Sequence, residues 1–466
     1  MLESNTRQCL SARSQPAADP SARGLPRRWR RGVLGLFGLL VPSLGLLSLP
    51  SACSEWTGVC WNDDPCGDEQ VCDRSRHVCV PRSTISDGGD STSDMNPAAT
   101  VCQQWNVQSL TLTFPDFSPP LNTDGFGSAL ALGESGELFI GAPNHSDGAA
   151  LNVGAIYVAS GTGTNYTVSQ LLLPAVSASN LSLGTELAVG GPTLLSAPGD
   201  NINGRGAPLA VYSFAKSGKT WAGGTMLTDP AGGANGLGRS LAFDGQYPAY
   251  VGAPVSSAMG GVYTLDAPRT LRVAIGFPTP PANFTNFGQT LAMTSSLLFV
   301  GGPSANETIT PSSHVFAYQR GSSPSLYGEI PRPTDLMDGD YFGNGLAADG
   351  GTLLVRTRNA VYVYRQDGSA FVQKAKLEIK DSVVALVNEN QALIGAPKSG
   401  TGGQVFSYDL TPLWSNGQPA RTDLSVPGLT NAYFGGAIAA RGGVVIVAAT
   451  EPLPYSQKLY TLTCQR

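Results

Sequence analysis

A sequence repeat of about fifty residues occurs seven times between Trp105 and Arg466. Each copy contains four short runs of β-branched or aromatic residues that are bounded by Gly, Pro, Ser or Asn, which is typical of strands. Four strands per repeat at a fixed long period predict radial sheets, so we expect an all-β fold, a seven-bladed β-propeller. A sandwich of ordinary strands would not produce an ordered recurrence of motifs at this period.

Two signatures define the repeat. The first is Phe-Gly or Leu-Gly before a Leu-Ala or Ile-Ala pair, and it begins at residues 126, 183, 237, 287, 342 and 434. The second is Gly-Ala-Pro or a close variant, and it begins at residues 141, 196, 252, 301 and 395. Small pairs suit strands crowded around an axis, and the Phe can fill the wedge between adjacent blades.

Three repeats depart from these signatures. The fifth carries Val355-Arg356-Thr357 and the seventh carries Ala448-Ala449-Thr450 in place of Gly-Ala-Pro. The sixth has Asp381-Ser382 where Phe-Gly is expected. In the six repeats that carry the first signature, the two signatures lie 13 to 15 residues apart, so the strand register is predicted to persist.

The sequence also predicts how the ring closes. The seventh repeat has three strand-like runs, and Trp105–Thr113 resembles the fourth strands of the other repeats, so it is expected to complete the last sheet. Cys102 precedes this segment and Cys464 follows the last run, which predicts a disulfide that locks the ring. In the chain-entropy model such a loop contributes at most about 6 kcal/mol.

The ordered Phe-Gly and Gly-Ala-Pro signatures resemble the FG-GAP repeat, the blade unit of the integrin α-subunit head and of many bacterial surface proteins. The resemblance covers nearly the whole chain from Cys102 onward. Many FG-GAP blades carry an Asp-rich calcium loop between their first two strands. The equivalent loops here, such as residues 133–137 and 349–351, lack the alternating carboxylates that a hard cation needs, so we expect no metal and no cofactor.

Residues 1–52 are predicted to be a signal peptide, because a basic stretch and an apolar run precede small residues at Cys53. The end of this segment resembles a bacterial lipobox, with Cys53 as the lipidated residue, although Pro50 stands where an aliphatic residue is usual. Simple cleavage and an uncleaved anchor stay open. We expect an exported protein, either an outer-membrane lipoprotein or a cell-surface or extracellular protein, that meets the membrane only through a lipid anchor.

Residues 53–81 are predicted to form a small disulfide-rich module. Two disulfides of open connectivity are favoured over zinc, because the gaps are long for paired zinc loops, among the four cysteines Cys60, Cys66, Cys72 and Cys79. Residues 82–100 are rich in Ser, Asp, Gly and Thr and predict a flexible linker to the propeller at 101–466. Without residues 1–52 the chain holds 22 basic and 32 acidic residues, which argues against binding to nucleic acid.

The sequence offers little catalytic chemistry. None of the histidines, His77, His145 and His314, has an acidic or cysteine partner at triad or ligand spacing. No glycine-rich phosphate loop follows a strand and opens a helix. We therefore expect a protein that is not an enzyme.

The favoured function is a noncatalytic cell-envelope binding or adhesion scaffold, a monomer whose lipid-tethered propeller meets an unknown protein or glycan. Loops on a rigid scaffold are where recognition concentrates. The candidate contact residues follow second strands and are Asn144, His145, Asp147, Asp200, Asn201, Asn203 and Arg205. The alternative is a carbohydrate-binding lectin with sugar sites between blades, and the least favoured function is an extracellular hydrolase.

Overall fold

The structure is a computed structural model that describes residues 70–73, 78–81, 101–121, 123–198, 210–228, 236–254, 260–267, 270–275, 286–304, 312–430, 432–450 and 457–465. The chain divides into two compact units, Met1–Ser93 and Asp94–Arg466. In the first unit the described residues form one antiparallel hairpin of β1 (Gln70–Asp73) and β2 (Val78–Pro81). Cys72 lies opposite Cys79 in its strand register.

Several sequence predictions fall outside the described residues. These are the signal peptide at 1–52, the lipidation site Cys53, the linker at 82–100, and the cysteines Cys60 and Cys66. The side chains of Cys72 and Cys79 are not described, so the connectivity of the module stays open. Part of the predicted contact set also lies outside the described residues, namely Asp200, Asn201, Asn203 and Arg205.

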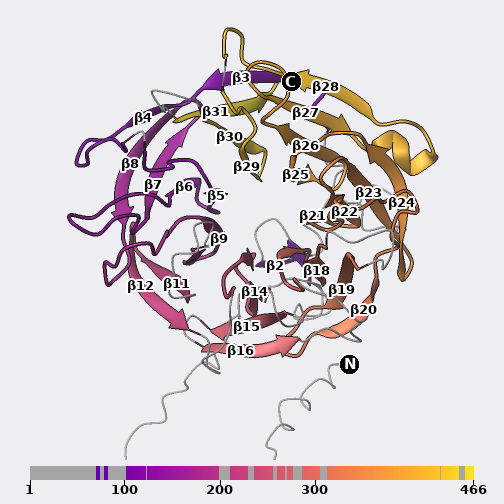
Figure 1. Cartoon of the computed structure of the whole chain (residues 1–466), viewed down its shortest axis with the longest axis horizontal. Helices are drawn as coiled ribbons and strands as arrows, with labels where there is room; N and C mark the ends of the chain where they lie inside the picture. The colour runs from indigo at the N-terminus through magenta and orange to yellow at the C-terminus, as the bar shows by residue number, and fades with distance from the viewer. Residues whose placement is uncertain are drawn as a thin grey trace, which may run out of the picture. The chain divides into compact units, whose positions relative to one another are not determined.

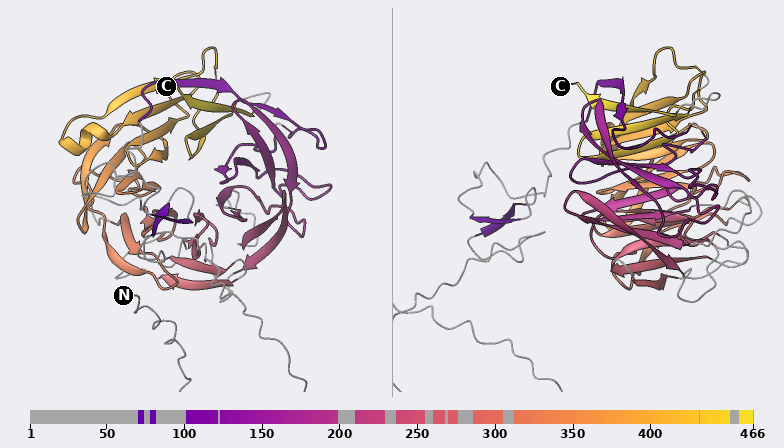
Figure 2. Two further views of the ribbon diagram at one scale, coloured as in Figure 1. Left: turned by 180° about the vertical axis from the view of Figure 1, so that it is seen from behind. Right: turned by 90° about the vertical axis from the view of Figure 1, so that its left-hand side faces the viewer.

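The described residues of the second unit form seven sheets arranged as a β-propeller (Figure 1). Figure 2 shows this ring of sheets from behind and from the side. In blades one to four the strands, from the innermost outwards, are β5 (Leu130–Leu132), β6 (Glu137–Ala142), β7 (Ala155–Thr162) and β8 (Asn165–Leu172); β9 (Glu186–Gly190), β10 (Thr193–Ala197), β11 (Ala210–Ser217) and β12 (Thr220–Thr228); β13 (Ser240–Ala242), β14 (Ala249–Ala253), β15 (Gly261–Ala267) and β16 (Thr270–Ile275); and β17 (Thr290–Met293), β18 (Leu297–Gly302), β19 (His314–Gln319) and β20 (Ser325–Glu329). The predicted seven-bladed propeller is confirmed.

Blades five to seven continue the pattern. Their strands, from the innermost outwards, are β21 (Gly345–Asp349), β22 (Thr352–Arg356), β23 (Val361–Asp367) and β24 (Ala370–Leu377); β25 (Val383–Asn388), β26 (Gln391–Ala396), β27 (Gln404–Asp409) and β28 (Ala420–Leu424); and β29 (Ala437–Arg441), β30 (Val444–Thr450), β31 (Gln457–Cys464) and β3 (Trp105–Ser109). A short 3-10 turn, η2 (Thr411–Ser415), joins β27 to β28. Blade six keeps all four strands although its first signature is lost.

The two signature glycines of the repeat meet across the seams between blades. A Cβ added to Gly141 of blade one would lie 1.9 Å from the carbonyl oxygen of Gly184 in blade two. A Cβ added to Gly252 of blade three would lie 2.0 Å from the carbonyl oxygen of Gly288 in blade four. Because the backbones of neighbouring blades touch here, the Gly-Ala-Pro glycine of one blade and the Phe-Gly glycine of the next are required by the same contact.

The signature Phe packs edge-on against an aromatic ring on the third strand of its own blade. The ring centroids of Phe126 and Tyr157 are 5.2 Å apart in blade one, and those of Phe342 and Tyr362 are 6.2 Å apart in blade five. Both Phe side chains are buried. Phe126 shares its apolar cluster with residues of blade seven, including Ile446, which confirms that the signature Phe fills a wedge between blades.

The ring closes as the sequence predicts. β3, from the start of the propeller, pairs with β31 as the fourth strand of blade seven (Figure 1). The predicted disulfide between Cys102 and Cys464 is present, with the two Cα atoms 5.5 Å apart, and it joins positions 362 residues apart. These contacts replace the covalent continuity that every other blade has.

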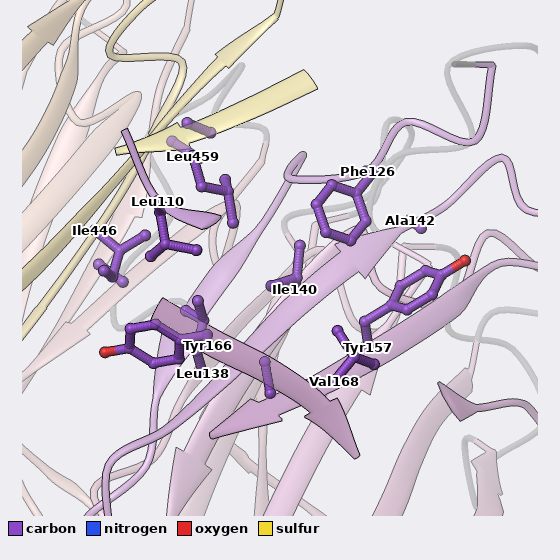
Figure 3. Packing of buried hydrophobic residues seen from close by; sticks show 14 of the residues in the cluster. Leu110, Phe126, Leu138, Ile140, Ala142, Tyr157, Tyr166, Val168, Ile446 and Leu459 are labelled. Carbon is purple, nitrogen blue, oxygen red and sulfur yellow. The ribbon is translucent and has the colours of Figure 1, made fainter. Parts of the chain in front are cut away.

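The predicted closing strand, 105–113, is divided between two blades. β3 ends at Ser109, and β4 (Thr111–Thr113) pairs in parallel with β8 on the outside of blade one. The amide of Leu110, between the two strands, donates a hydrogen bond of 2.8 Å to the carbonyl oxygen of Leu459. Figure 3 shows Leu110 beside Leu459 and Ile446 of blade seven. One segment therefore fastens both sides of the closing seam.

The seven innermost strands surround an axial cavity of about 360 Å³. The residues that line it are Leu, Ala, Val, Ile, Phe and Met, with Arg441 as the one charged residue. Small and aliphatic side chains fill the narrow part of the ring, as predicted for the Leu-Ala and Ile-Ala pairs. In the part of the chain that the structure describes, no helix is long and apolar enough to cross a membrane.

Candidate functional site

Asp124 and His145 form a hydrogen-bonded pair in blade one. Asp124 precedes β5 and His145 follows β6, and these antiparallel strands bring the two residues to the same end of the sheet. His145 Nδ1 lies 2.9 Å from Asp124 Oδ2. The Asp124 side chain is only 4% exposed, whereas that of His145 is 20% exposed. Within the described residues, His145 Nε2 is neither buried nor hydrogen-bonded.

Backbone groups hold the Asp124 carboxylate in place. Its Oδ2 accepts a hydrogen bond of 3.1 Å from the amide of Leu121, and its carbonyl oxygen accepts one of 2.9 Å from the amide of Asn144. The ring of Tyr157 lies 6.4 Å from the imidazole of His145 in an edge-on arrangement. Burial, with a contribution from the Asp124 charge, raises the pKa of Tyr157 to about 12. The orientation of the imidazole is therefore fixed from two sides.

Blade five contains the same arrangement without an imidazole. Asp340 Oδ2 accepts a hydrogen bond of 2.8 Å from the amide of Met337, and its carbonyl oxygen accepts one of 2.6 Å from the amide of Arg358. Asn359 Nδ2 then donates a hydrogen bond of 2.6 Å to Asp340 Oδ1. The aspartate is therefore part of the scaffold of both blades, and only blade one places a titratable base against it.

A second polar group lies at the inner rim of the same face, where the chain enters the innermost strands. The residue after the glycine of the first signature takes part in the same backbone turn in six blades, and these residues are Ser128, Thr185, Arg239, Gln289, Asn344 and Gly436. Five of the six are polar residues, whereas the residues that line the axial cavity are aliphatic, small or aromatic apart from Arg441. We call this group the inner rim.

Arg356 brings a second guanidinium to the inner rim. Its carbonyl oxygen accepts a hydrogen bond of 3.1 Å from the amide of Gly343, as that of Gly141 accepts one from Gly127 in blade one. Arg356 therefore stands where most blades have the glycine of Gly-Ala-Pro. Its side chain lies against Gly345, where an added Cβ would be 3.0 Å from the arginine Nε.

The Arg356 side chain fits because the next blade also departs from the pattern. Arg356 Nη1 donates a hydrogen bond to the carbonyl oxygen of Ser382, which belongs to the segment that replaces Phe-Gly in blade six. Nη2 donates one of 2.7 Å to the carbonyl oxygen of Asn344. The loss of Gly-Ala-Pro in blade five and the loss of Phe-Gly in blade six therefore meet in one contact, at the seam between these two blades.

The charges at the inner rim influence one another. Burial raises the pKa of the half-buried Glu186 to about 7, and the charge of Arg239 opposes this rise. Burial is also the main reason why the pKa of Arg356 lies below its ordinary value; Asp381 opposes this shift and the positive charge of Arg239 adds to it. Arg239 and Arg356 come from blades three and five, so this charge effect acts between blades that are not neighbours in the ring.

At the opposite end of the axial cavity, the charge of Arg441 is neutralised by an ion pair with Glu134. Arg441 Nη2 lies 2.9 Å from Glu134 Oε1, and Arg441 Nη1 donates hydrogen bonds to the carbonyl oxygens of Leu132 and Val189, each at 3.2 Å. The same pair supplies the charged lining of a neighbouring cavity of about 440 Å³ at the seam between blades seven and one. The arginine and glutamate compensate each other.

Of the described contact residues predicted from the sequence, His145 is paired with Asp124. Asn144 donates its amide to the carbonyl oxygen of Asp124, and Asp147 Oδ2 accepts a hydrogen bond of 2.6 Å from Ser177 Oγ. Sequence spacing predicted no acidic partner for any histidine, but strand pairing supplies one for two of them. The second is His314, whose Nδ1 lies 2.6 Å from Glu329 Oε1.

No family model matches this chain, and no curated protein matches it. The FG-GAP resemblance therefore stays a prediction. Among solved structures, the chain is similar to a periplasmic gluconolactonase of Pseudomonas aeruginosa, with 16% identity, coverage of 65% of this chain and 89% of the other, and a TM-score of 0.44. It is also similar to a Bacteroides fragilis protein described as a 6-phosphogluconolactonase, with 11% identity, coverage of 70% and 94%, and a TM-score of 0.43.

These comparisons correct the functional expectation. A noncatalytic envelope scaffold, with a lectin as its alternative, was favoured because no catalytic pair was visible in the sequence. Both similar structures carry the names of lactonases, which are enzymes, so the expectation of a protein that is not an enzyme is contradicted. With TM-scores below 0.5, neither assigns a substrate or a site to this chain. The expected protein or glycan partner is not tested and stays a prediction.

Proposed function

We propose that this chain is an exported hydrolase of carboxylic esters or lactones in which His145 is the general base. The observation that carries the proposal is the 2.9 Å hydrogen bond between His145 Nδ1 and the buried carboxylate of Asp124. A carboxylate in this position holds the proton on Nδ1 and leaves the lone pair on Nε2. His145 Nε2 is unburied and has no partner within the described residues, so a water molecule can reach it.

The reaction follows from that tautomer. Nε2 takes a proton from water while the water oxygen bonds to the carbonyl carbon of the substrate. Asp124 stabilises the imidazolium that forms, because its carboxylate is already oriented by the backbone amide of Leu121. The tetrahedral intermediate then breaks its bond to the leaving oxygen, which receives the proton from Nε2. An ester yields an acid and an alcohol, and a lactone yields one hydroxy acid.

A single imidazole base suits the hydrolysis of esters and lactones better than the hydrolysis of glycosides. Glycoside hydrolysis ordinarily needs two carboxyl groups on opposite sides of the bond, and the Asp124 carboxyl is turned toward His145. Ester and lactone carbonyls accept water directly and have an oxygen leaving group that needs one proton. A base that operates near neutral pH is suited to this reaction.

Blade five supplies the matched control for a test. His145→Asn copies the Asp340–Asn359 pair of blade five and removes the base, while Asn359→His places an imidazole against Asp340. We expect His145→Asn to lower kcat/KM by about 100-fold or more, the usual contribution of a general base. Asn359→His keeps the base of blade one and should not lower hydrolysis. Turnover is measured on p-nitrophenyl acetate, p-nitrophenyl butyrate and δ-gluconolactone, with circular dichroism to verify the fold of each variant.

Two results would overturn the proposal. One is the absence of turnover by the purified wild-type chain on every ester and lactone of the panel. The other is a His145→Asn variant that is folded and as active as the wild type. Activity that disappears on repurification of the wild type counts as the first result, because it belongs to a contaminant.

Export is part of the proposal. The Cys102–Cys464 disulfide is of the kind that persists in an oxidising compartment, in agreement with the predicted signal peptide at 1–52. We propose in addition that Cys53 carries a lipid, a position outside the described residues. Mass spectrometry of the N-terminal peptide of the mature protein tests this, since acylation and simple cleavage leave different masses.

A further inference from the structure

The seam between blades seven and one contains a cavity of about 440 Å³, a volume within the range of small-molecule sites. Several of its lining residues are glycines, at positions 133, 136, 161, 163, 442 and 443, and the surface that it offers is mainly apolar. The larger side chains that line it include Leu132, Tyr166 and Val444. Its charged residues, Arg441 and Glu134, form an ion pair with each other, so neither leaves an uncompensated charge.

The seam between blades one and two shows how the same space is filled elsewhere in the ring. There Phe139 of the second strand packs edge-on against Trp221 of the next blade's fourth strand, with ring centroids 5.0 Å apart. Glu137 forms an ion pair with Lys216, whose Nζ lies 6.0 Å from the centroid of the same indole. An aromatic ring and an ion pair therefore occupy this end of the seam.

The corresponding positions of the closing seam carry smaller side chains. Strand register places Val444 and Ile446 at the positions of the glutamate and the phenylalanine. Tyr166 takes the position of the tryptophan, and its cross-strand partner is Gly161 in place of the lysine. Tyr166 and Ile446 belong to one buried cluster (Figure 3). Aliphatic side chains and a glycine thus leave open the space that a ring and an ion pair fill between blades one and two.

Two hydroxyl groups give the cavity its polar character. Thr461 lines it from the third strand of blade seven, and Tyr166 lines it from the fourth strand of blade one. Both residues are almost fully buried, with exposures of 2% and 5%, and neither hydroxyl has a hydrogen-bond partner among the described residues. Blade one has Val158 at the position of Thr461, so packing does not require a hydroxyl there. A hydroxyl group on a ligand could both donate to and accept from these two groups.

The other seams indicate the kind of ligand that fits. In two of them a ring of the second strand packs edge-on against a ring of the next blade's fourth strand. The second example is Phe299 with Phe371, whose centroids are 5.3 Å apart. A ligand ring against Tyr166 would reproduce this arrangement at the closing seam. A charged ligand would find no unpaired counter-charge, and a sugar would turn most of its hydroxyls towards apolar surface.

We propose that the cavity between blades seven and one binds a small uncharged aromatic molecule with one hydroxyl group, a phenol. Its ring lies against Tyr166 and Val444, and its hydroxyl lies at Thr461. The site is separate from the His145–Asp124 pair, because residues 133–136 precede β6 whereas His145 follows it. Binding breaks no bond, so this proposal does not rest on the proposed hydrolysis.

Calorimetric titration of the full chain at pH 7 tests the site with phenol, and with benzoate as a charged ring of similar size. We expect saturable binding of phenol, and binding of benzoate that is weaker by about tenfold or more because its charge is unpaired in the cavity. Val444→Trp should weaken phenol binding by about tenfold or more, since the indole competes for the same space. Val372→Trp on β24 is the matched control, because the two valines are 40% and 39% exposed, and it should bind phenol as the wild type does.

A second variant keeps the shape of the cavity and changes only its polarity. Thr461→Val removes the hydroxyl and should weaken phenol binding by about threefold or more, the usual contribution of a hydrogen bond. Circular dichroism verifies that each variant is folded. The proposal is overturned if phenol does not bind saturably, if benzoate binds as tightly as phenol, or if either folded variant, Val444→Trp or Thr461→Val, binds phenol as tightly as the wild type.

Discussion

Blades one and five are built alike and differ in the chemistry they display. Both place an aspartate before the innermost strand, where it accepts a backbone amide three residues earlier, and both pack the signature Phe against a third-strand Tyr. Blade one sets His145 against its aspartate, whereas blade five sets Asn359 there. Blade one keeps Gly141 at the seam to the next blade, whereas blade five has Arg356.

The comparison of the two blades separates residues that stabilise the fold from residues that could take part in a reaction. Because Asp340 makes the same backbone contacts as Asp124, the aspartate alone is no sign of catalysis. In the proposed reaction the base is the imidazole, which only blade one of this pair of blades places against its aspartate. In blade five the arginine reaches the inner rim only because blade six lacks the glycine that other blades press against this position.

The largest expected effect is a loss of stability on removal of the closing disulfide, which should weaken the blades at the closing seam more than blade five. Replacing both Cys102 and Cys464 by Ala should lower the free energy of unfolding by up to about 6 kcal/mol, since the loop they close spans 362 residues. Denaturant unfolding measures the total loss. Hydrogen exchange should show faster amide exchange in blades one and seven than in blade five. Equal loss of protection in all blades would contradict the contrast.

A smaller effect separates the two aspartates. Asp124→Asn and Asp340→Asn should each destabilise the fold by about 1 to 2 kcal/mol, because each weakens the same backbone contacts. Only Asp124→Asn should also reduce ester or lactone turnover, by about tenfold or more, since the imidazole loses the partner that fixes its tautomer. Unfolding curves and kcat are compared for the pair. Equal losses of activity in both variants would show that the aspartates act only through stability.

A pH-dependent effect concerns Glu186 of blade two, whose pKa is influenced by the charge of Arg239 at the inner rim. The pKa of Glu186 is raised from its ordinary value of 4.5 to about 7, so the folded state holds its proton more tightly than the unfolded state. Stability attributable to this group is therefore present below about pH 4.5 and is lost as pH rises towards 7. Against a Glu186→Gln variant, the wild type should lose roughly 1 to 3 kcal/mol between about pH 4.5 and pH 8. Parallel pH profiles of the two proteins would refute a proton-retaining Glu186.

Much of the fold follows from the sequence because the period of the repeat indicates where each strand begins and which strand it pairs with. The signatures lie at fixed distances on β-strands that pair as neighbours, so the spacing that identifies a blade also fixes its register. The closing disulfide was predictable because both cysteines flank strands with assignable places. The division of 105–113 into β3 and β4 was not, because the run carries no turn residue at Leu110 and the switch depends on packing between blades.

The candidate site was visible only in part. His145 was singled out as a loop residue, but Asp124 was missed because the partners are 21 residues apart and meet only when β5 and β6 pair. A signal did exist. Asp124 stands two residues before Phe126, and His145 stands two residues after the Pro of Gly-Ala-Pro, so the two signatures place both residues at one end of a blade.

By itself the sequence determined the number of blades, the order of their strands and the covalent closure of the ring, because these depend on periodicity along the chain. Only the tertiary structure decided that the departures in blades five and six are one contact, and that Arg239 and Arg356 share a rim. Such contacts join residues of different blades. Their existence depends on how closely the sheets pack around the axis, which no spacing within a repeat specifies.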